Sequence, residues 1–215
     1  LEFRRVLFRS QPPGAPPEGV SCFPYFYPYF PMPAADRLRL DKKGGSPYAP
    51  ALFRAVRDFR PDVIHIHAGG RLACAAVKLA RRLGVPCVKC SNFTGEALDA
   101  AACEGFERVL LVGHIGKLVK LAGGIMNTHS KTADCRRELI TCHAALCGAS
   151  SDTCRALMDE VTTDGCLAVL NSAGLCEAVM QSLLHAIQEQ LSRRAGDMRI
   201  GALLFSNEAG FLGLT

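Results

Sequence analysis

The sequence lacks several features that would assign it to a class at once. No apolar run approaches the roughly 18–20 residues that a membrane-spanning helix needs, and the N-terminus does not have the pattern of a secretory signal peptide. Only Cys87 and Cys90 form a CxxC pair, and no second pair or histidine pair follows at zinc-ligand spacing. We therefore expect a cytoplasmic protein with no metal site and no membrane partner.

Length and composition describe an ordinary globular chain. Its 215 residues allow one large or two small domains, and 49% of them are hydrophobic. The net charge of +5 suits an anionic small molecule as well as a nucleic acid, although plain surface charge gives the same total. Eleven cysteines are scattered, mostly among Ala and Leu, as small buried thiols are. We expect them to be reduced, and we expect a small-molecule partner rather than a nucleic acid.

The chain changes character along its length. Residues 1–10, "LEFRRVLFRS", show no cap, no turn signal and no continuing period, and they resemble the translation of a common sequencing-library adapter. Residues 11–47 are rich in Pro, Gly and aromatic residues, which is the composition of a loop or linker. We therefore expect residues 1–45 to be disordered or loosely packed.

From residue 46 helical and extended patterns alternate. "SPYAPALFRAVRDF" carries an apolar stripe typical of a helix, "PDVIHIH" reads as a buried strand, and "RLACAAVKLARRLG" as a helix closed by Gly84. Strands follow in "VPCVKC" and "RVLLVG", and a long helix ending at Gly196 leads to a last strand, Arg199–Phe205. This order predicts an α/β fold, a partly parallel sheet with helices on both faces.

The stretch "GHIGKLVKLAGGIMNTHSKTADC", residues 113–135, mixes glycine, lysine and histidine directly after a predicted strand. Glycines before a helix let an anion approach free backbone N–H groups. Two named motifs do not fit, because a P-loop needs GxxxxGK[ST] and a dinucleotide fingerprint needs GxGxxG, whereas only GxxG is present. We interpret the stretch as an anion site that belongs to neither class.

Within this stretch we predict a helix over residues 114–122. Ile115, Leu118, Val119 and Ala122 would form its buried face, with His114, Lys117 and Lys120 on the other side. A solvated basic face is the alternative to a ligand-binding one. Asn127, Thr128 and Ser130 are natural N-cap residues for a next helix over about 131–147. Capping does not explain His129, which is a candidate general acid or base, although a single histidine is more often structural.

Three polar turns each follow a predicted strand. "CSN" follows the strand near 86–90, "GHIG" the strand near 107–112, and "SNE" the strand near 198–204. Ligands of open α/β sheets bind outside the carboxyl ends of the strands. We therefore expect residues 90–92, 113–117, 127–130 and 206–208 to line one cleft.

Two family resemblances divide the chain. Residues 46–88, in particular "RPDVIHIH" and "LARRLGVPCV", resemble the N-terminal half-domain of family 4 (GT-B) glycosyltransferases. "KCSNFTGE" then departs from that family, and its nucleotide-sugar-binding domain is not in the sequence. His65 and His67 alternate along a strand and face one side. The resemblance implies a position near an acceptor, and the simpler alternative is a pair of polar residues at a strand end.

Residues 89–215 resemble the C-terminal part of the CbiD family of cobalt-precorrin-5B C-1 methyltransferases. The words that carry this are "KCSNFTGEALD", "LLVGHIGKLVKLAGGIMNTHSKTADCRRELI" and "ALLFSNEAGFLG". The resemblance implies S-adenosylmethionine as cofactor and a cobalt-precorrin tetrapyrrole as substrate, methylated in anaerobic cobalamin (vitamin B12) biosynthesis. It suggests His129 and His114 as catalytic groups, and Lys117, Lys120, Asn127, Thr128 and Ser130 as substrate contacts. Cofactor contacts are expected among Cys90, Ser91, Asn92, Gly113, Gly116, Gly123, Gly124, Ser206, Asn207 and Glu208.

The two resemblances meet at "PCVKCSNF", where both families have a strand. We interpret the chain as a chimera of an adapter-like decapeptide (1–10), a glycosyltransferase-like fragment (11–88) and a CbiD-like domain (89–215). Glycosyltransferase-like sequence stands where the rest of a CbiD protein is expected, which predicts an inactive methyltransferase fragment. The alternatives are a glycosyltransferase fragment and a folded domain without catalysis.

Overall fold

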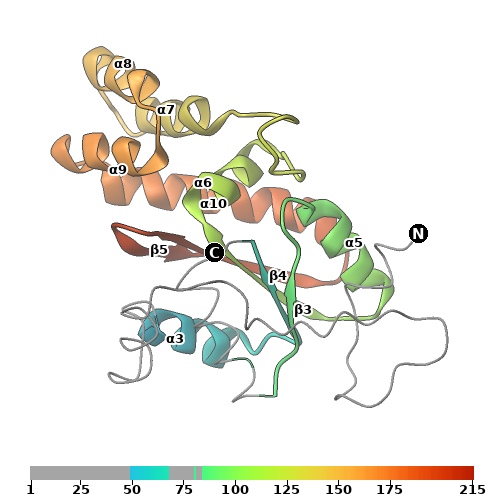
Figure 1. Ribbon diagram of the computed structural model, residues 1–215. Coiled ribbons are helices and arrows are strands. Elements are labelled where there is room, and N and C mark those ends of the chain that lie inside the picture. Colours follow the sequence, from blue (N-terminus) through green and yellow to red (C-terminus); the bar gives the residue numbers. More distant parts are fainter. Residues whose placement is uncertain (1–48, 68–79, 81–83) are drawn as a thin grey trace, which may run out of the picture.

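The computed structural model describes residues 49–67, 80 and 84–215, and these build one mixed sheet covered by helices (Figure 1). The sheet has the strand order β2-β1-β3-β4-β5. Its strands are β1 (Val63–Ile66), β2 (Cys87–Lys89), β3 (Arg108–His114), β4 (Arg199–Ser206) and β5 (Gly210–Leu214). The first four run parallel, and β5 pairs antiparallel with β4. The predicted α/β fold with a partly parallel sheet is confirmed.

Helices cover both faces of the sheet, as predicted (Figure 1). On one face α3 (Ala49–Phe59) packs Leu52, Val56 and Phe59 against Leu110 and Phe205 of the strands. The other face carries α5 (Thr94–Cys103), α6 (Ile115–Leu118), the 3-10 helix η1 (Val119–Gly123), α7 (Arg136–Leu146), α8 (Ser151–Asp159), α9 (Thr163–Ser172) and α10 (Cys176–Ala195). Two apolar clusters, one on each face, therefore hold the sheet.

The longest helix, α10, stabilises the second face. Val179, Leu183, Ile187 and Leu191 recur at helical spacing and are fully buried. They belong to the apolar cluster that includes strand and η1 residues. The helix ends at Gly196, whose φ of 56° is in the left-handed region that glycine adopts without strain. The predicted helix and its glycine stop are confirmed.

The expected boundary at residues 88–89 falls inside β2 and does not separate two folded units. Strand β1 lies between β2 and β3, with Ile64 opposite both Cys87 and Leu110. Residues on either side of the boundary therefore share a sheet and its buried clusters. The glycosyltransferase-like residues supply strands of the same sheet as the CbiD-like residues.

Several local expectations differ from the structure. The helix expected over 114–122 is a single α-turn followed by η1, and the helix expected over 131–147 begins only at Arg136. Strand β5 was not expected at all, because "SNEAG" reads as a terminal loop rather than as a hairpin turn. The predictions for residues 1–45, and for the helix over 71–84 apart from Ala80 and Gly84, lie outside the described residues.

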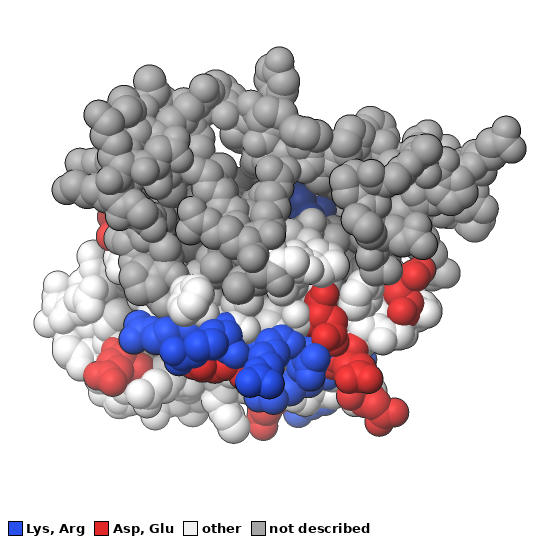
Figure 2. All heavy atoms as spheres, turned by 90° about the horizontal axis from the view of Figure 1, so that it is seen from below, with Lys and Arg blue, Asp and Glu red and all other residues white. Residues whose placement is uncertain are grey.

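Charges of both signs lie beside one another on the surface shown in Figure 2. Exposed or half-buried ion pairs such as Arg57 with Asp58 and Arg108 with Asp62 follow this mixed pattern. In the described part of the chain no helix has the length and apolar character to cross a membrane. The mixed charges of this face therefore do not indicate where a charged ligand would bind.

Candidate functional site

A hollow of about 530 Å³ opens at the carboxyl ends of the parallel strands. Its volume lies within the roughly 300–1,000 Å³ of small-molecule sites. Twelve residues line this strand-end hollow: His67, Lys89, Ser91, Asn92, His114, Gly116, Lys117, Arg136, Thr162, Thr163, Asp164 and Asn207. They follow β1, β2, β3 and β4 or begin α7 and α9. Of the four segments predicted to line one cleft, the three turns after β2, β3 and β4 contribute to the hollow, and residues 127–130 do not.

Cations outnumber anions in the strand-end hollow. Lys89, Lys117 and Arg136 line it, against Asp164 as the acidic residue among the lining residues that the structure describes. Burial lowers the pKa of Lys117, and the nearby charges of Lys120 and Arg136 lower it further. Its Nζ donates to Asn92 Oδ1 at 2.9 Å. Lys117 is thus a half-buried cation held in place by Asn92, which suits an anionic ligand.

The imidazole of His114 has a fixed orientation. Its Nδ1 accepts the N–H of Gly116 at 3.0 Å, and its ring edge meets Phe205 with centroids 5.5 Å apart. In the neutral ring the proton must therefore sit on Nε2, which lies 3.8 Å from Asp164 Oδ2. Burial lowers the pKa of His114 although Asp164 opposes the shift. Neutral His114 therefore directs a buried Nε2–H toward Asp164 and presents no free base to the strand-end hollow.

Asp164 is held by β4 and by its own helix. The Ser206 hydroxyl donates to Asp164 Oδ1 and itself accepts the N–H groups of Glu208 and Ala209, each at 3.1 Å. Asp164 lies in the first turn of α9, whose N-cap Thr162 accepts the N–H of Gly165 at 3.0 Å. Negative charge is favourable in a first helical turn. Asp164 was not identified from the sequence, and the signal that could have found it is the helix start "TTDG" at residues 162–165.

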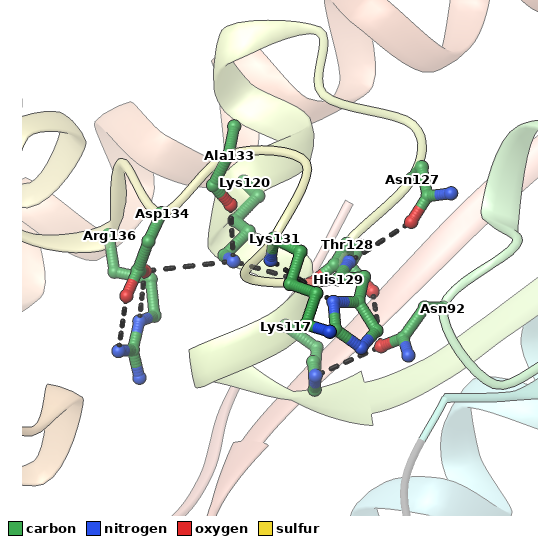
Figure 3. A network of polar contacts seen from close by, with 10 residues as sticks. All are labelled: Asn92, Lys117, Lys120, Asn127, Thr128, His129, Lys131, Ala133, Asp134 and Arg136. Atoms are coloured by element: carbon green, nitrogen blue, oxygen red, sulfur yellow. Dashed lines mark hydrogen bonds and ion pairs between the residues drawn. The ribbon is translucent and has the colours of Figure 1, made fainter.

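The loop after η1 is tied to the strand-end hollow by Asn92 and Lys120 (Figure 3). Thr128 donates its N–H to Asn92 O at 2.9 Å and its hydroxyl to Asn92 Oδ1 at 3.3 Å. Lys120 Nζ donates to Thr128 O at 3.2 Å and to Ala133 O at 2.7 Å, and lies 3.6 Å from Asp134 Oδ1. The Lys120 side chain is only 2% exposed.

The expected exposed basic face is therefore wrong at Lys120. This lysine is buried on η1 and cross-links the loop by donating to two backbone carbonyls. Asn127, Thr128 and Ser130 do not cap the next helix either, since α7 begins at Arg136 with Cys135 as its N-cap. Thr128 is fully buried.

Several other predicted residues lie outside the lining of the strand-end hollow. His129 is exposed, and its Nδ1 accepts the N–H of Lys131 at 3.1 Å. Gly123 packs against Leu139, and Gly124 ends η1 with a φ of 75°. Asn127, Thr128, Ser130, Cys90, Gly113, Ser206 and Glu208 are also absent from the lining. Of the predicted residues, Ser91, Asn92, His114, Gly116, Lys117 and Asn207 do line it.

Below the strand-end hollow, His67 and Cys90 form a buried pair. His67 Nε2 lies 2.8 Å from Cys90 Sγ, and His67 Nδ1 lies 2.9 Å from Ser91 O. This is consistent with Nδ1–H donating to the carbonyl while Nε2 accepts from the thiol. Burial raises the pKa of the Cys90 thiol, which therefore stays protonated. His67 thus braces the turn that carries Ser91 and Asn92, a role that its strand-end position did not reveal.

Comparisons with known proteins match both halves of the chain. A family model described as the CbiD C-terminal domain matches residues 127–215, and one described as a glycosyl transferase 4-like domain matches residues 4–118. The chain belongs to the glycosyl transferase 4-like family, whose model matches more than half of it, and its C-terminal part is similar to the CbiD C-terminal domain. The second match begins inside the decapeptide 1–10 and extends into β3 and α6, beyond the expected boundary. The interpretation of the chain as a chimera is consistent with these matches.

Relatives named cobalt-precorrin-5B C(1)-methyltransferase share more of the chain than the CbiD model covers. The one from Ruminiclostridium cellulolyticum is 47% identical over 121 residues, which are 56% of this chain and 32% of that protein. Those from Alkaliphilus metalliredigens and Methanocaldococcus jannaschii are 40% and 33% identical over 126 residues, covering 58% and 59% of this chain and 33% and 35% of those proteins. The chain spans about a third of the length of these relatives. No solved structure matches it.

Proposed function

We propose that the strand-end hollow is the ligand site of a cobalt-precorrin-5B C-1 methyltransferase that uses S-adenosylmethionine in anaerobic cobalamin synthesis in the cytoplasm. The observation that carries the proposal is the set of three cations, Lys89, Lys117 and Arg136, around one hollow at the strands' carboxyl ends. A precorrin carries acetate and propionate carboxylates, which such cations bind by charge-assisted hydrogen bonds. The names of the relatives support this substrate class.

The residues present fit a methyl donor as well. Gly116 lines the hollow, and a side chain there would crowd His114 Nδ1 at 3.2 Å and Thr163 Oγ1 at 3.3 Å, so only glycine leaves this part of the lining free of a side chain. When bound, S-adenosylmethionine supplies a methyl group on a sulfonium that a ring carbon can attack. The protein's task is to hold the two reactants in line, and orientation contributes up to about 7–11 kcal/mol to such reactions.

The side chains divide this task by their chemistry. Lys117, braced by Asn92, and Arg136, paired with Asp134 at 2.6 Å, would orient carboxylates of the macrocycle. His114 would hold the lining in place, because its Nδ1 accepts the Gly116 N–H and its buried Nε2 faces Asp164. We assign no proton transfer to His129, which is exposed and lies outside the lining. Lys120, Thr128 and Asn127 would act by fixing the loop beside Asn92.

We further propose that this chain binds its ligands but turns them over little. The matched relatives are about three times as long as the matched segment, and the preceding sequence here belongs to another family. Excluding water and aligning the reactants require a closed cleft. The strand-end hollow by itself orients carboxylates without enclosing a macrocycle.

The binding proposal predicts salt-sensitive association with a polycarboxylate porphyrin. Uroporphyrin, titrated into the full chain and followed by its fluorescence, is expected to bind weakly at low salt and more weakly at 0.5 M salt, because salt screens partly exposed charges. The double variant Lys117→Ala with Arg136→Ala is expected to raise Kd about 10- to 100-fold, since hydrogen bonds to charged groups contribute about 1.5–3 kcal/mol.

A matched control removes the same charge elsewhere. The double variant Lys131→Ala with Arg155→Ala alters exposed side chains outside the lining and should leave Kd within about twofold. Equal losses in both double variants would contradict the site. Binding of a nucleotide sugar such as UDP-glucose, without binding of uroporphyrin, would instead favour a glycosyltransferase function, which the match over residues 4–118 supports.

A further inference from the structure

The strand-end hollow has two electrostatic poles. Lys117 lies on α6, directly after β3, and Arg136 begins α7, after the loop that follows η1. Asp164 lies in the first turn of α9, beside β4. Among the residues that the structure describes, no Lys or Arg forms an ion pair with Asp164; its ionisable neighbour is the neutral His114, whose Nε2 lies 3.8 Å from Asp164 Oδ2. The cationic pole has an obvious ligand in the carboxylates of the acceptor. The acidic pole has none in the proposed function as stated.

Asp164 has one carboxylate oxygen to offer. Oδ1 accepts the Ser206 hydroxyl, which fixes the carboxylate relative to β4. Oδ2 lies beyond hydrogen-bond distance from His114 Nε2, and the side chain is 21% exposed at the wall of the hollow. A carboxylate so placed attracts cations and repels a polycarboxylate acceptor. The oxygen is therefore suited to a positively charged ligand group.

We propose that Asp164 binds the positively charged part of the methyl donor, and that Lys117 and Arg136 bind the carboxylates of the acceptor. This rests on the proposed function and assigns the two ligands to opposite poles of one hollow. S-adenosylmethionine carries a sulfonium and an ammonium, so it is the ligand whose charge matches Asp164. Opposite poles also give a physical reason why the two reactants would not exchange places, since each is repelled by the other's pole.

The test compares donor and acceptor binding in one variant. Asp164→Asn keeps an oxygen for the Ser206 hydroxyl but removes the charge. By titration calorimetry the variant is expected to bind S-adenosylmethionine at least about tenfold more weakly, and to bind uroporphyrin at least as tightly as the unaltered chain. Simple structural damage would weaken both ligands, so a loss of both overturns the inference. Asp152→Asn, at an exposed position on α8, serves as the matched control and should change neither Kd.

S-adenosylhomocysteine separates the two cationic groups of the donor, because it keeps the ammonium and lacks the sulfonium charge. An equal loss of affinity for S-adenosylmethionine and S-adenosylhomocysteine in Asp164→Asn places the ammonium at Asp164, and a loss confined to S-adenosylmethionine places the sulfonium there; either supports the inference. Unchanged donor affinity in Asp164→Asn overturns it and leaves the proposed function standing. An unaltered chain that binds uroporphyrin but no donor also overturns it. A chain that binds neither ligand contradicts the proposed function itself.

Discussion

Acidifying the protein from pH 7 to pH 4 is expected to remove several kcal/mol of folding stability, because two buried histidines resist protonation. Burial lowers the pKa of His65 to about 3 and that of His67 to about 4. The charge of His67 lowers the pKa of His65 further, and Lys117 does the same to His67, while the Ser91 carbonyl opposes the shift in His67. Both rings are therefore neutral in the folded protein above pH 4.

The sign follows from where protons bind. Below an unfolded pKa of 6.5 the unfolded chain takes up protons that the folded chain refuses, so each histidine lowers the free energy of unfolding by about 1.4 kcal/mol per pH unit. The loss from His67 ends near pH 4 and that from His65 near pH 3. Burial lowers the pKa of His114 and His143 as well, which adds to the same trend.

Denaturant unfolding at pH 7, 6, 5 and 4.5 measures this loss. His67→Gln is expected to be less stable at pH 7 but to show a slope with pH that is shallower by about 1.4 kcal/mol per unit. His185→Gln is the control, because His185 is 79% exposed on α10 and should leave the slope unchanged. A stability that stays level from pH 7 to pH 4.5 would show that neither buried histidine resists protonation.

Replacing Lys120 by methionine is expected to lower the free energy of unfolding by about 2–4 kcal/mol. Methionine fills a similar volume but leaves Thr128 O and Ala133 O without the ammonium donor, and each buried polar group left unsatisfied costs about 1–3 kcal/mol. The loop over residues 127–134 should lose protection from amide hydrogen exchange in the same variant. Lys131→Met, which changes an exposed lysine of that loop, should alter stability by less than about 0.5 kcal/mol.

This variant separates a structural lysine from a ligand-binding one. If Lys120→Met were as stable as Lys131→Met and only weakened uroporphyrin binding, Lys120 would be a ligand contact and its hydrogen bonds to the loop would be dispensable. The structure predicts instead that Lys120→Met lowers the free energy of unfolding much more than Lys131→Met does. Any loss of ligand affinity would then follow from the loosened loop beside Asn92.

The sheet was predictable because its strands are short buried runs separated by helical stripes. The parallel pairing of β1 with β3 and of β3 with β4 follows from that alternation. Convergence of Ser91, Asn92, His114 and Lys117 at one edge follows from the same geometry, since parallel strands end together. The features that depend on element order and hydrophobic period could therefore be predicted from the sequence.

Other features depend on contacts that a pattern does not encode. The chain switches to a 3-10 helix at Val119 and buries Lys120, and no residue type in "KLVKLAGG" predicts either feature. The carbonyls that Lys120 binds, Thr128 O and Ala133 O, lie in a loop, so no helical period relates them to Lys120. Asp164 is 42 residues from Ser206, so their contact depends on how α9 packs against β4. Strand β5 depends on its pairing with β4, because "GFLGL" alone is too short and glycine-rich to predict a strand.

The two family segments share one core, and this bears on what the chain does. Strand β1 and the turn after β2 supply His67, Lys89 and Ser91 to the same hollow that β3 supplies with His114 and Lys117. If the boundary is placed at residue 88, His67 comes from the glycosyltransferase-like segment and Ser91 from the CbiD-like one. The contact between His67 Nδ1 and Ser91 O nevertheless stabilises the turn after β2. Under the proposed function, a ligand site assembled in this way would bind its ligands without turning them over.

The most direct test of that separation is a turnover measurement on a sample already shown to bind uroporphyrin. The full chain is incubated with cobalt-precorrin-5B and S-adenosylmethionine, and the methylated corrinoid is measured by mass spectrometry. We predict ligand binding with no methylated product above the protein-free background, because the strand-end hollow orients its ligands without enclosing them. Methylated product formed over repeated turnovers would contradict this, and would show that this chain suffices for catalysis.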